Sequence, residues 1–232
     1  MKCPCLRSDR FALYLPPNKE DELSAIANKL VVAGKGILAA DETPSTLGVR
    51  FKSIGLQNTP ENRKAYRQVL FSADCSISRY ISGIILHPET LEEATDNGTP
   101  LISLITDRKI IPGVKVDLGL VDLAGTFGEC TTQGLDELNE RCARYKNDGC
   151  QFAKWRCALK ICSKTPSYLA MKETANVIAR FAMICQKVRL NFLPVDTDTF
   201  SPIQYGKKFR LNLTHIRVSG SINMTGLAFL SR

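Results

Sequence analysis

The chain has 232 residues, of which 44% are hydrophobic, and this length and composition suffice for a sizeable buried core. Its formal net charge of +8 is concentrated in residues 1–10 and 187–232, so the body of the chain is close to neutral. A near-neutral body argues against a folded polyanion-binding surface, and we expect no nucleic-acid partner.

The cysteines, histidines and apolar runs of the sequence indicate the cellular compartment of the protein and whether it binds metal or a membrane. Nine cysteines and two histidines without paired metal-ligand spacings favour reduced thiols and no metal site. No apolar run reaches about 18 residues, the minimum for a membrane-spanning helix, and no signal-peptide pattern occurs. We therefore expect a cytoplasmic protein without a membrane partner.

Helical and strand patterns alternate along the chain. Helices are signalled by capping residues, an acidic first turn, proline at the first helical position and apolar residues at helical spacing. They are expected at 18–34, 59–72, 135–145 and 166–186, with a short helix or loop over 91–106. Buried strands are expected at 36–41, 81–87, 111–117 and 149–160.

This alternation predicts βαβ units and a parallel sheet covered by helices, either doubly wound or closed as an eight-fold barrel. Periodicity alone leaves both architectures open. No glycine-rich phosphate-binding fingerprint follows any of the four expected strands, which disfavours a nucleotide-binding doubly wound fold.

Charged side chains recur where the expected strands end. Asp41 ends the first strand, Lys115 and Asp117 share a face of the third, and Lys154 and Arg156 share a face of the fourth. Barrel active sites are assembled at the carboxyl ends of strands, although structural salt bridges would explain the same pattern. Spacing alone points to Lys154 as a nucleophile that attacks a carbonyl.

Several motifs then resemble one family closely. They are Gly36-Ile-Leu-Ala-Ala-Asp41-Glu42, residues 61–70, Gly113-Val-Lys115-Val-Asp117, Leu123-Ala-Gly-Thr126, Thr131-Thr-Gln-Gly-Leu135 and Phe152-Ala-Lys154-Trp-Arg156. Over residues 19–186 the chain resembles class I fructose-bisphosphate aldolase. The resemblance implies a (β/α)₈ barrel, a homotetramer, and cleavage of fructose 1,6-bisphosphate in glycolysis through a lysine imine, without metal or cofactor.

The resemblance also implies roles for individual residues. Asp41 would handle the proton of the substrate hydroxyl next to the bond that breaks, and Lys154 beside it would favour its charged form. Phosphate or hydroxyl oxygens of the sugar phosphate would be faced by Lys115, Arg50 and Arg156, with Thr46 where the family usually has serine and Arg63 as a further candidate. Leu118 stands where relatives often carry a lysine.

After Gln186 the family's later motifs, including its Schiff-base lysine, are not recognisable in this sequence. We therefore divide the chain into an N-terminal extension (1–18), a partial barrel of about four of eight βα units (19–186) and a basic tail (187–232). Residues 193–198 are faintly similar to the family's fifth strand, which makes Asp196 a candidate for the place of a catalytic glutamate. The expected function is an impaired aldolase, or alternatively a non-catalytic variant that binds sugar phosphate or associates with full-length subunits.

Overall fold

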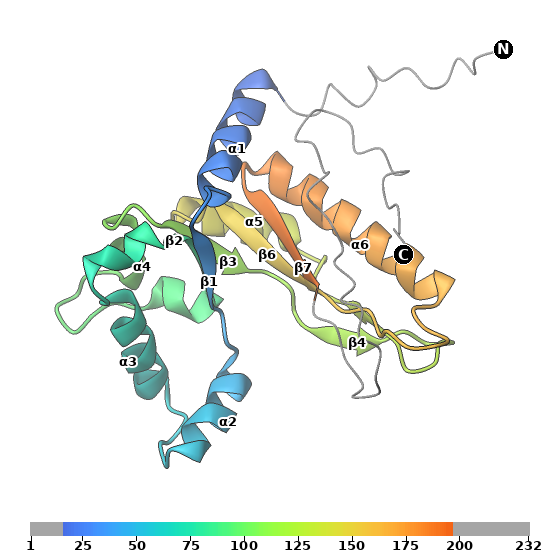
Figure 1. Cartoon of the computed structure of the whole chain (residues 1–232), viewed down its shortest axis with the longest axis horizontal. Helices are drawn as coiled ribbons and strands as arrows, with labels where there is room; N and C mark the ends of the chain where they lie inside the picture. Colours follow the sequence, from blue (N-terminus) through green and yellow to red (C-terminus); the bar gives the residue numbers. More distant parts are fainter. Residues whose placement is uncertain (1–15, 197–232) are drawn as a thin grey trace.

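Five parallel strands form one curved sheet in the order β1-β2-β3-β6-β7 (Figure 1). The structure is a computed structural model and describes residues 16–196. The strands are β1 (Gly36–Ala40), β2 (Ile81–Leu86), β3 (Ile111–Lys115), β6 (Phe152–Cys157) and β7 (Asn191–Asp196). Because every neighbouring pair in this sheet is parallel, the carboxyl ends of its strands lie at one edge.

Helices connect these strands and a short antiparallel hairpin projects beyond β3. The helices are α1 (Pro17–Leu30), α2 (Pro44–Ser53), α3 (Pro60–Phe71), α4 (Leu101–Thr106), α5 (Leu138–Asn147) and α6 (Tyr168–Lys187), with 3₁₀ helices η3 (Cys75–Arg79) and η4 (Pro88–Glu92). The hairpin consists of β4 (Leu120–Asp122) and β5 (Cys130–Thr132). Side chains of Thr43, Thr59 and Ser167 cap α2, α3 and α6, as such residues do at helix starts.

The structure differs from the sequence prediction at five places. The sheet has a fifth strand, β7, which pairs with β6 and includes the residues that are faintly similar to the family's fifth strand. Neither α2 nor the β4–β5 hairpin was predicted. The helix expected from residue 135 begins only at Leu138, because Glu137 before it adopts a left-handed backbone conformation with φ 54°. The segment 91–106 divides into the end of η4, a bridge between Ala94 and Pro100, and α4.

The two faces of the sheet are buried against different partners. On the convex side, α3 and α4 pack against β1 and β2, and α5 and α6 pack against β3 and β6. On the concave side, Phe152 packs with Ile85 and with Leu30 of α1, and Ile37, Ile111 and Leu193 surround them. Side chains alternate along β6, since Phe152 lies in this inner cluster and Ala153 and Trp155 lie in the outer one, so Lys154 and Arg156 share the face of Phe152 as the sequence predicted.

Gly113 gives the Phe152 ring its place in the concave core. A Cβ atom at Gly113 would overlap the ring, which is fully buried, whereas a Cβ at Gly36 would meet nothing within 4 Å. We expect Gly113→Ala to lower the free energy of unfolding by about 1–3 kcal/mol through overpacking. Gly36→Ala, also in the sheet, is the matched control and should change it by less than about 0.5 kcal/mol. Urea denaturation of the two variants measures the difference, and equal effects would contradict the packing argument.

Among the helices of residues 16–196, none combines the length and the apolar character needed to cross a membrane. In the same part of the chain, no three His, Cys, Asp or Glu side chains are grouped so that they could hold a metal ion.

Candidate active site

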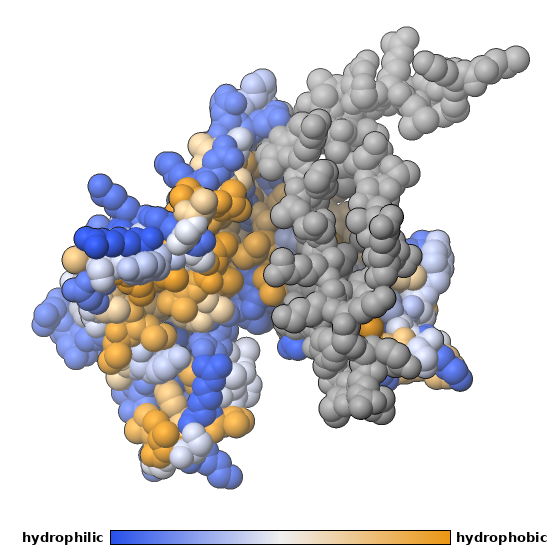
Figure 2. Space-filling model, in the orientation of Figure 1, coloured by the Kyte–Doolittle hydropathy of each residue, from blue (hydrophilic) through white to orange (hydrophobic). Residues whose placement is uncertain are grey.

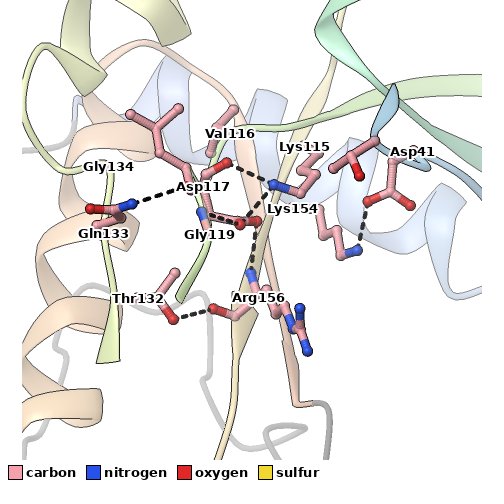
Figure 3. Close-up of polar contacts among 12 residues, drawn as sticks. Asp41, Lys115, Val116, Asp117, Gly119, Thr132, Gln133, Gly134, Lys154 and Arg156 are labelled. Carbon is pink, nitrogen blue, oxygen red and sulfur yellow. Dashed lines mark hydrogen bonds and ion pairs between the residues drawn. The ribbon is translucent and has the colours of Figure 1, made fainter. Parts of the chain in front are cut away.

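The curvature of the sheet brings together an acid and a base from strands that are not neighbours. Asp41 follows β1 and Lys154 lies in β6, with β2 and β3 between them in the sheet. Even so, Lys154 Nζ donates a hydrogen bond of 2.6 Å to Asp41 Oδ2 across the concave face (Figure 3). Their side chains are 13% and 9% exposed, so this ion pair is largely shielded from water.

Lys115 lies beside this pair but bonds within its own segment. Its Nζ donates to both the main-chain oxygen and the Oδ1 atom of Asp117, each at 2.7 Å (Figure 3). The Asp117 carboxylate also accepts hydrogen bonds from the backbone N–H groups of Gly119 and Arg156, both at 3.2 Å. Asp117 thus fixes Lys115 and ties the end of β3 to β6.

Arg156 lies two residues after Lys154 in β6, on the same face of the strand. Its main-chain oxygen accepts a hydrogen bond of 2.7 Å from Thr132 of the hairpin (Figure 3). Together with its N–H bond to Asp117, this contact anchors Arg156 to the segment that carries Lys115. Asp41, Lys115, Lys154 and Arg156 therefore gather at the carboxyl edge of the sheet.

The other candidates from the sequence lie on α2 and α3, with partners of their own. Arg50, whose side chain is 57% exposed, forms an ion pair with Glu42. The Thr46 hydroxyl lies 3.0 Å from that of Thr43 at the start of α2. Arg63 donates to Glu89 at distances from 2.6 to 3.2 Å, which is the geometry of a structural ion pair. Each of these three residues thus has a partner within the protein, and contact with a substrate stays a prediction for all three.

Two further positions from the sequence analysis are placed only in part. Asp196 ends β7, where its backbone is opposite Cys157 of β6, and its side chain lies outside what the structure describes. Leu118, where relatives often carry a lysine, is 61% exposed beyond the end of β3.

Sequence reasoning missed a network of ion pairs between α3 and the segment that follows β2. Arg67, only 1% exposed, donates to Glu89 at 2.7 Å and to Glu93 at 3.0 Å, and Arg63 shares Glu89. Hydrogen bonds from Arg63, with further contributions from Arg67, lower the pKa of Glu89 to about 2. Burial raises the pKa of Glu93. The spacing of Arg63 and Arg67, one helical turn apart on α3, was the available signal.

Comparison with known proteins decides the family. A sequence model of the glycolytic class-I fructose-bisphosphate aldolases matches residues 22–198 of this chain. The chain belongs to this family. The fructose-bisphosphate aldolase of Echinococcus multilocularis is 56% identical over 178 residues, a match that covers 77% of this chain and 49% of that relative. Human fructose-bisphosphate aldolase C is 56% identical over 173 residues, covering 75% and 48%.

A solved aldolase structure has the same fold over the matched part. The Plasmodium falciparum fructose-bisphosphate aldolase, in a ternary complex with TRAP and a small-molecule inhibitor, superposes with a TM-score of 0.75 and 47% sequence identity. The match covers 78% of this chain and 53% of that structure. The aldolase resemblance is thereby confirmed, as is the expected incomplete (β/α) barrel. The chain spans about half the length of the curated aldolases that it matches.

Proposed function

We propose that this aldolase-family chain binds a phosphorylated sugar at the carboxyl edge of its sheet and supplies the acid–base groups of class I aldolase chemistry. The observation that carries the proposal is the shielded pair of Asp41 and Lys154, with Nζ and Oδ2 2.6 Å apart. Lys115 and Arg156 flank the pair and offer cations for phosphate or hydroxyl oxygens. The substrate is then fructose 1,6-bisphosphate of glycolysis, which the family cleaves to dihydroxyacetone phosphate and glyceraldehyde 3-phosphate.

In this proposal Asp41 accepts the proton of the substrate hydroxyl next to the carbon–carbon bond that breaks. The ammonium group of Lys154 donates a hydrogen bond to the carboxylate and so holds it in one orientation. Lys154 is then a supporting cation, and the nucleophilic role that spacing alone assigned to it passes to the family's imine-forming lysine. No metal ion or organic cofactor is part of the proposal.

We further propose that a polypeptide of these 232 residues is impaired in catalysis, because no segment of its sequence matches the motif of the imine-forming lysine. The electrons of the breaking bond need that imine as their acceptor. Lys154 held by Asp41 is a poor substitute, since an error of about 1 Å in the position of a reacting group costs about 10²-fold in rate.

Sugar-phosphate binding and imine formation are tested separately. Calorimetric titration with fructose 1,6-bisphosphate should show binding that Lys115→Ala weakens at least about tenfold, while Ala at the exposed Lys52 leaves it unchanged. Borohydride trapping with dihydroxyacetone phosphate should leave no lysine labelled. An unmodified chain that does not bind would sink the binding proposal, and a labelled lysine would show that imine chemistry survives.

A second candidate function is a non-catalytic variant that associates with full-length aldolase subunits. Among the described residues, β1 and β7 are the edges of the sheet and pair with one strand each. Figure 2 shows apolar residues gathered near the C-terminal end of α1 and β1, where Val31 and Val32 are exposed, and over α2. Unpaired edges and apolar surface favour association. Co-purification with a tagged intact aldolase subunit tests this candidate. Assembly of this chain into a homotetramer stays a proposal.

A further inference from the structure

The register of the sheet places one more side chain in the row of site residues. Ala40 of β1 pairs with Leu86 of β2, and Leu86 pairs with Val114 of β3. Continued by one residue, this register sets His87 between Asp41 and Lys115, and Lys115 in turn pairs with Lys154 of β6. Asp41 and His87, which directly follow β1 and β2, are thus at the level of Lys115 at the end of β3 and Lys154 in β6.

The alternation of β2 sets the face on which His87 lies. Ile85 belongs to the concave cluster with Phe152, whereas Leu86 belongs to the convex cluster under α3 and α4. His87 directly follows β2 and keeps an extended backbone, with φ −76° and ψ 144°, so the alternation continues and sets it on the same concave face as Ile85. Lys154, two residues after Phe152, lies on this face by the same argument. His87 is half-buried there.

A backbone hydrogen bond fixes which ring nitrogen of His87 carries the proton. Nδ1 accepts a hydrogen bond of 3.3 Å from the N–H of Glu89, so the neutral imidazole carries its proton on Nε2. The same hydrogen bond orients the ring, because the Glu89 N–H belongs to the first turn of η4.

The surroundings of His87 favour its neutral form. Burial lowers its pKa most, followed by the positive charge of Arg67 on α3. Lys115 of β3 also lowers this pKa, while the charges of Glu89 and of Asp41 after β1 raise it less than the other causes lower it. At neutral pH the ring is therefore an uncharged donor beside two charged residues, Asp41 and Lys115.

We propose that His87 is a further substrate-contacting residue, whose Nε2–H donates a hydrogen bond to a hydroxyl or phosphate oxygen of the bound sugar phosphate between Asp41 and Lys115. This inference rests on the proposed function, because it assigns a third kind of group to the same site. Asp41 provides an acceptor and Lys115 a cation, and His87 adds a neutral donor that a sugar hydroxyl can use without a change of charge.

Two substitutions separate the donor from the ring. Gln at position 87 retains an N–H donor near the place of Nε2, whereas Leu retains bulk without any donor. In calorimetric titration of the full chain with fructose 1,6-bisphosphate, we expect His87→Leu to weaken binding about five- to tenfold and His87→Gln by less than about twofold. Wild-type affinity in His87→Leu, alongside weakened binding in Lys115→Ala, would overturn this inference and leave the proposed function intact. Absence of binding by the unmodified chain would overturn both.

The substitutions at position 87 could weaken binding by disturbing the fold, so a second measurement uses the unmodified chain. Hydrogen exchange at the imidazole C2 carbon, read by mass spectrometry, reports on each of the two histidines separately. We expect fructose 1,6-bisphosphate to slow exchange at His87 severalfold, whereas sorbitol, which lacks phosphate, should leave the rate unchanged. An exchange rate that is the same with and without the sugar phosphate would contradict contact between His87 and the ligand.

Discussion

Lys154→Met is expected to destabilise the fold by about 3–5 kcal/mol and to abolish measurable sugar-phosphate binding. The change leaves the Asp41 carboxylate, 9% exposed, without the ammonium group that lies 2.6 Å from it. Removal of one partner from a shielded ion pair is costly because the remaining charge stays buried without compensation. Urea unfolding followed through the single tryptophan, Trp155, measures the loss, since this side chain is fully buried.

The double variant Asp41→Asn, Lys154→Met is the control for this prediction. It removes both charges, so it should be more stable than Lys154→Met alone even though it carries one more substitution. If the changes in the free energy of unfolding caused by Asp41→Asn and by Lys154→Met sum to the change in the double variant, Asp41 and Lys154 are not energetically coupled. Asp41 would then need another source of stabilisation for its charge.

Arg67→Met should lower the free energy of unfolding by a similar amount, about 3–5 kcal/mol, although Arg67 is not one of the proposed acid–base groups. Arg67 is 1% exposed and bonds to both Glu89 and Glu93, so its loss leaves Glu93 without its cation and Glu89 with Arg63 alone. Lys64→Met on the same helix is the matched control. Lys64 pairs with Asp96, whose side chain is 79% exposed, and pairs of this kind contribute about 0–1 kcal/mol. Thermal and urea unfolding that rank the two variants equally would refute the distinction.

The same network makes a pH dependence of stability that acid titration can test. Folding lowers the pKa of Glu89 from 4.5 to about 2, so its contribution is complete above pH 4.5 and disappears as the pH falls towards 2. Glu93 has the opposite shift, because burial raises its pKa, and its contribution therefore decreases as the pH rises. Glu89→Gln should flatten the stability profile between about pH 2 and 4.5. Glu93→Gln should remove the decrease in stability that Glu93 causes above pH 4.5 and leave the profile below that pH unchanged. If Glu93→Gln instead flattens the profile below pH 4.5 and Glu89→Gln does not, the assigned directions of the two pKa shifts are wrong.

The sequence predicted the strands of the sheet well where local pattern and burial agree. The runs at 81–87 and 111–117 contain β2 and β3, since apolar runs bounded by proline and charged residues have few alternative structures. The helix α2 was missed, although Thr43-Pro44 is a good start, because it is short and contains Gly48. The hairpin β4–β5 was missed because its strands have only three residues each.

For the site, the sequence by itself determined which residue types end the strands, and the family motifs determined the candidate roles of Asp41, Lys115, Lys154 and Arg156. Only the tertiary structure decided their partners. Asp41 and Lys154 are 113 residues apart and meet because four strands curve around Phe152. Arg63, another candidate, forms an ion pair with Glu89, and His87 is placed beside Asp41 by the continued register of β2. Local pattern fixes the face on which a side chain lies, whereas contacts across a curved sheet depend on register and packing, which are properties of the whole fold.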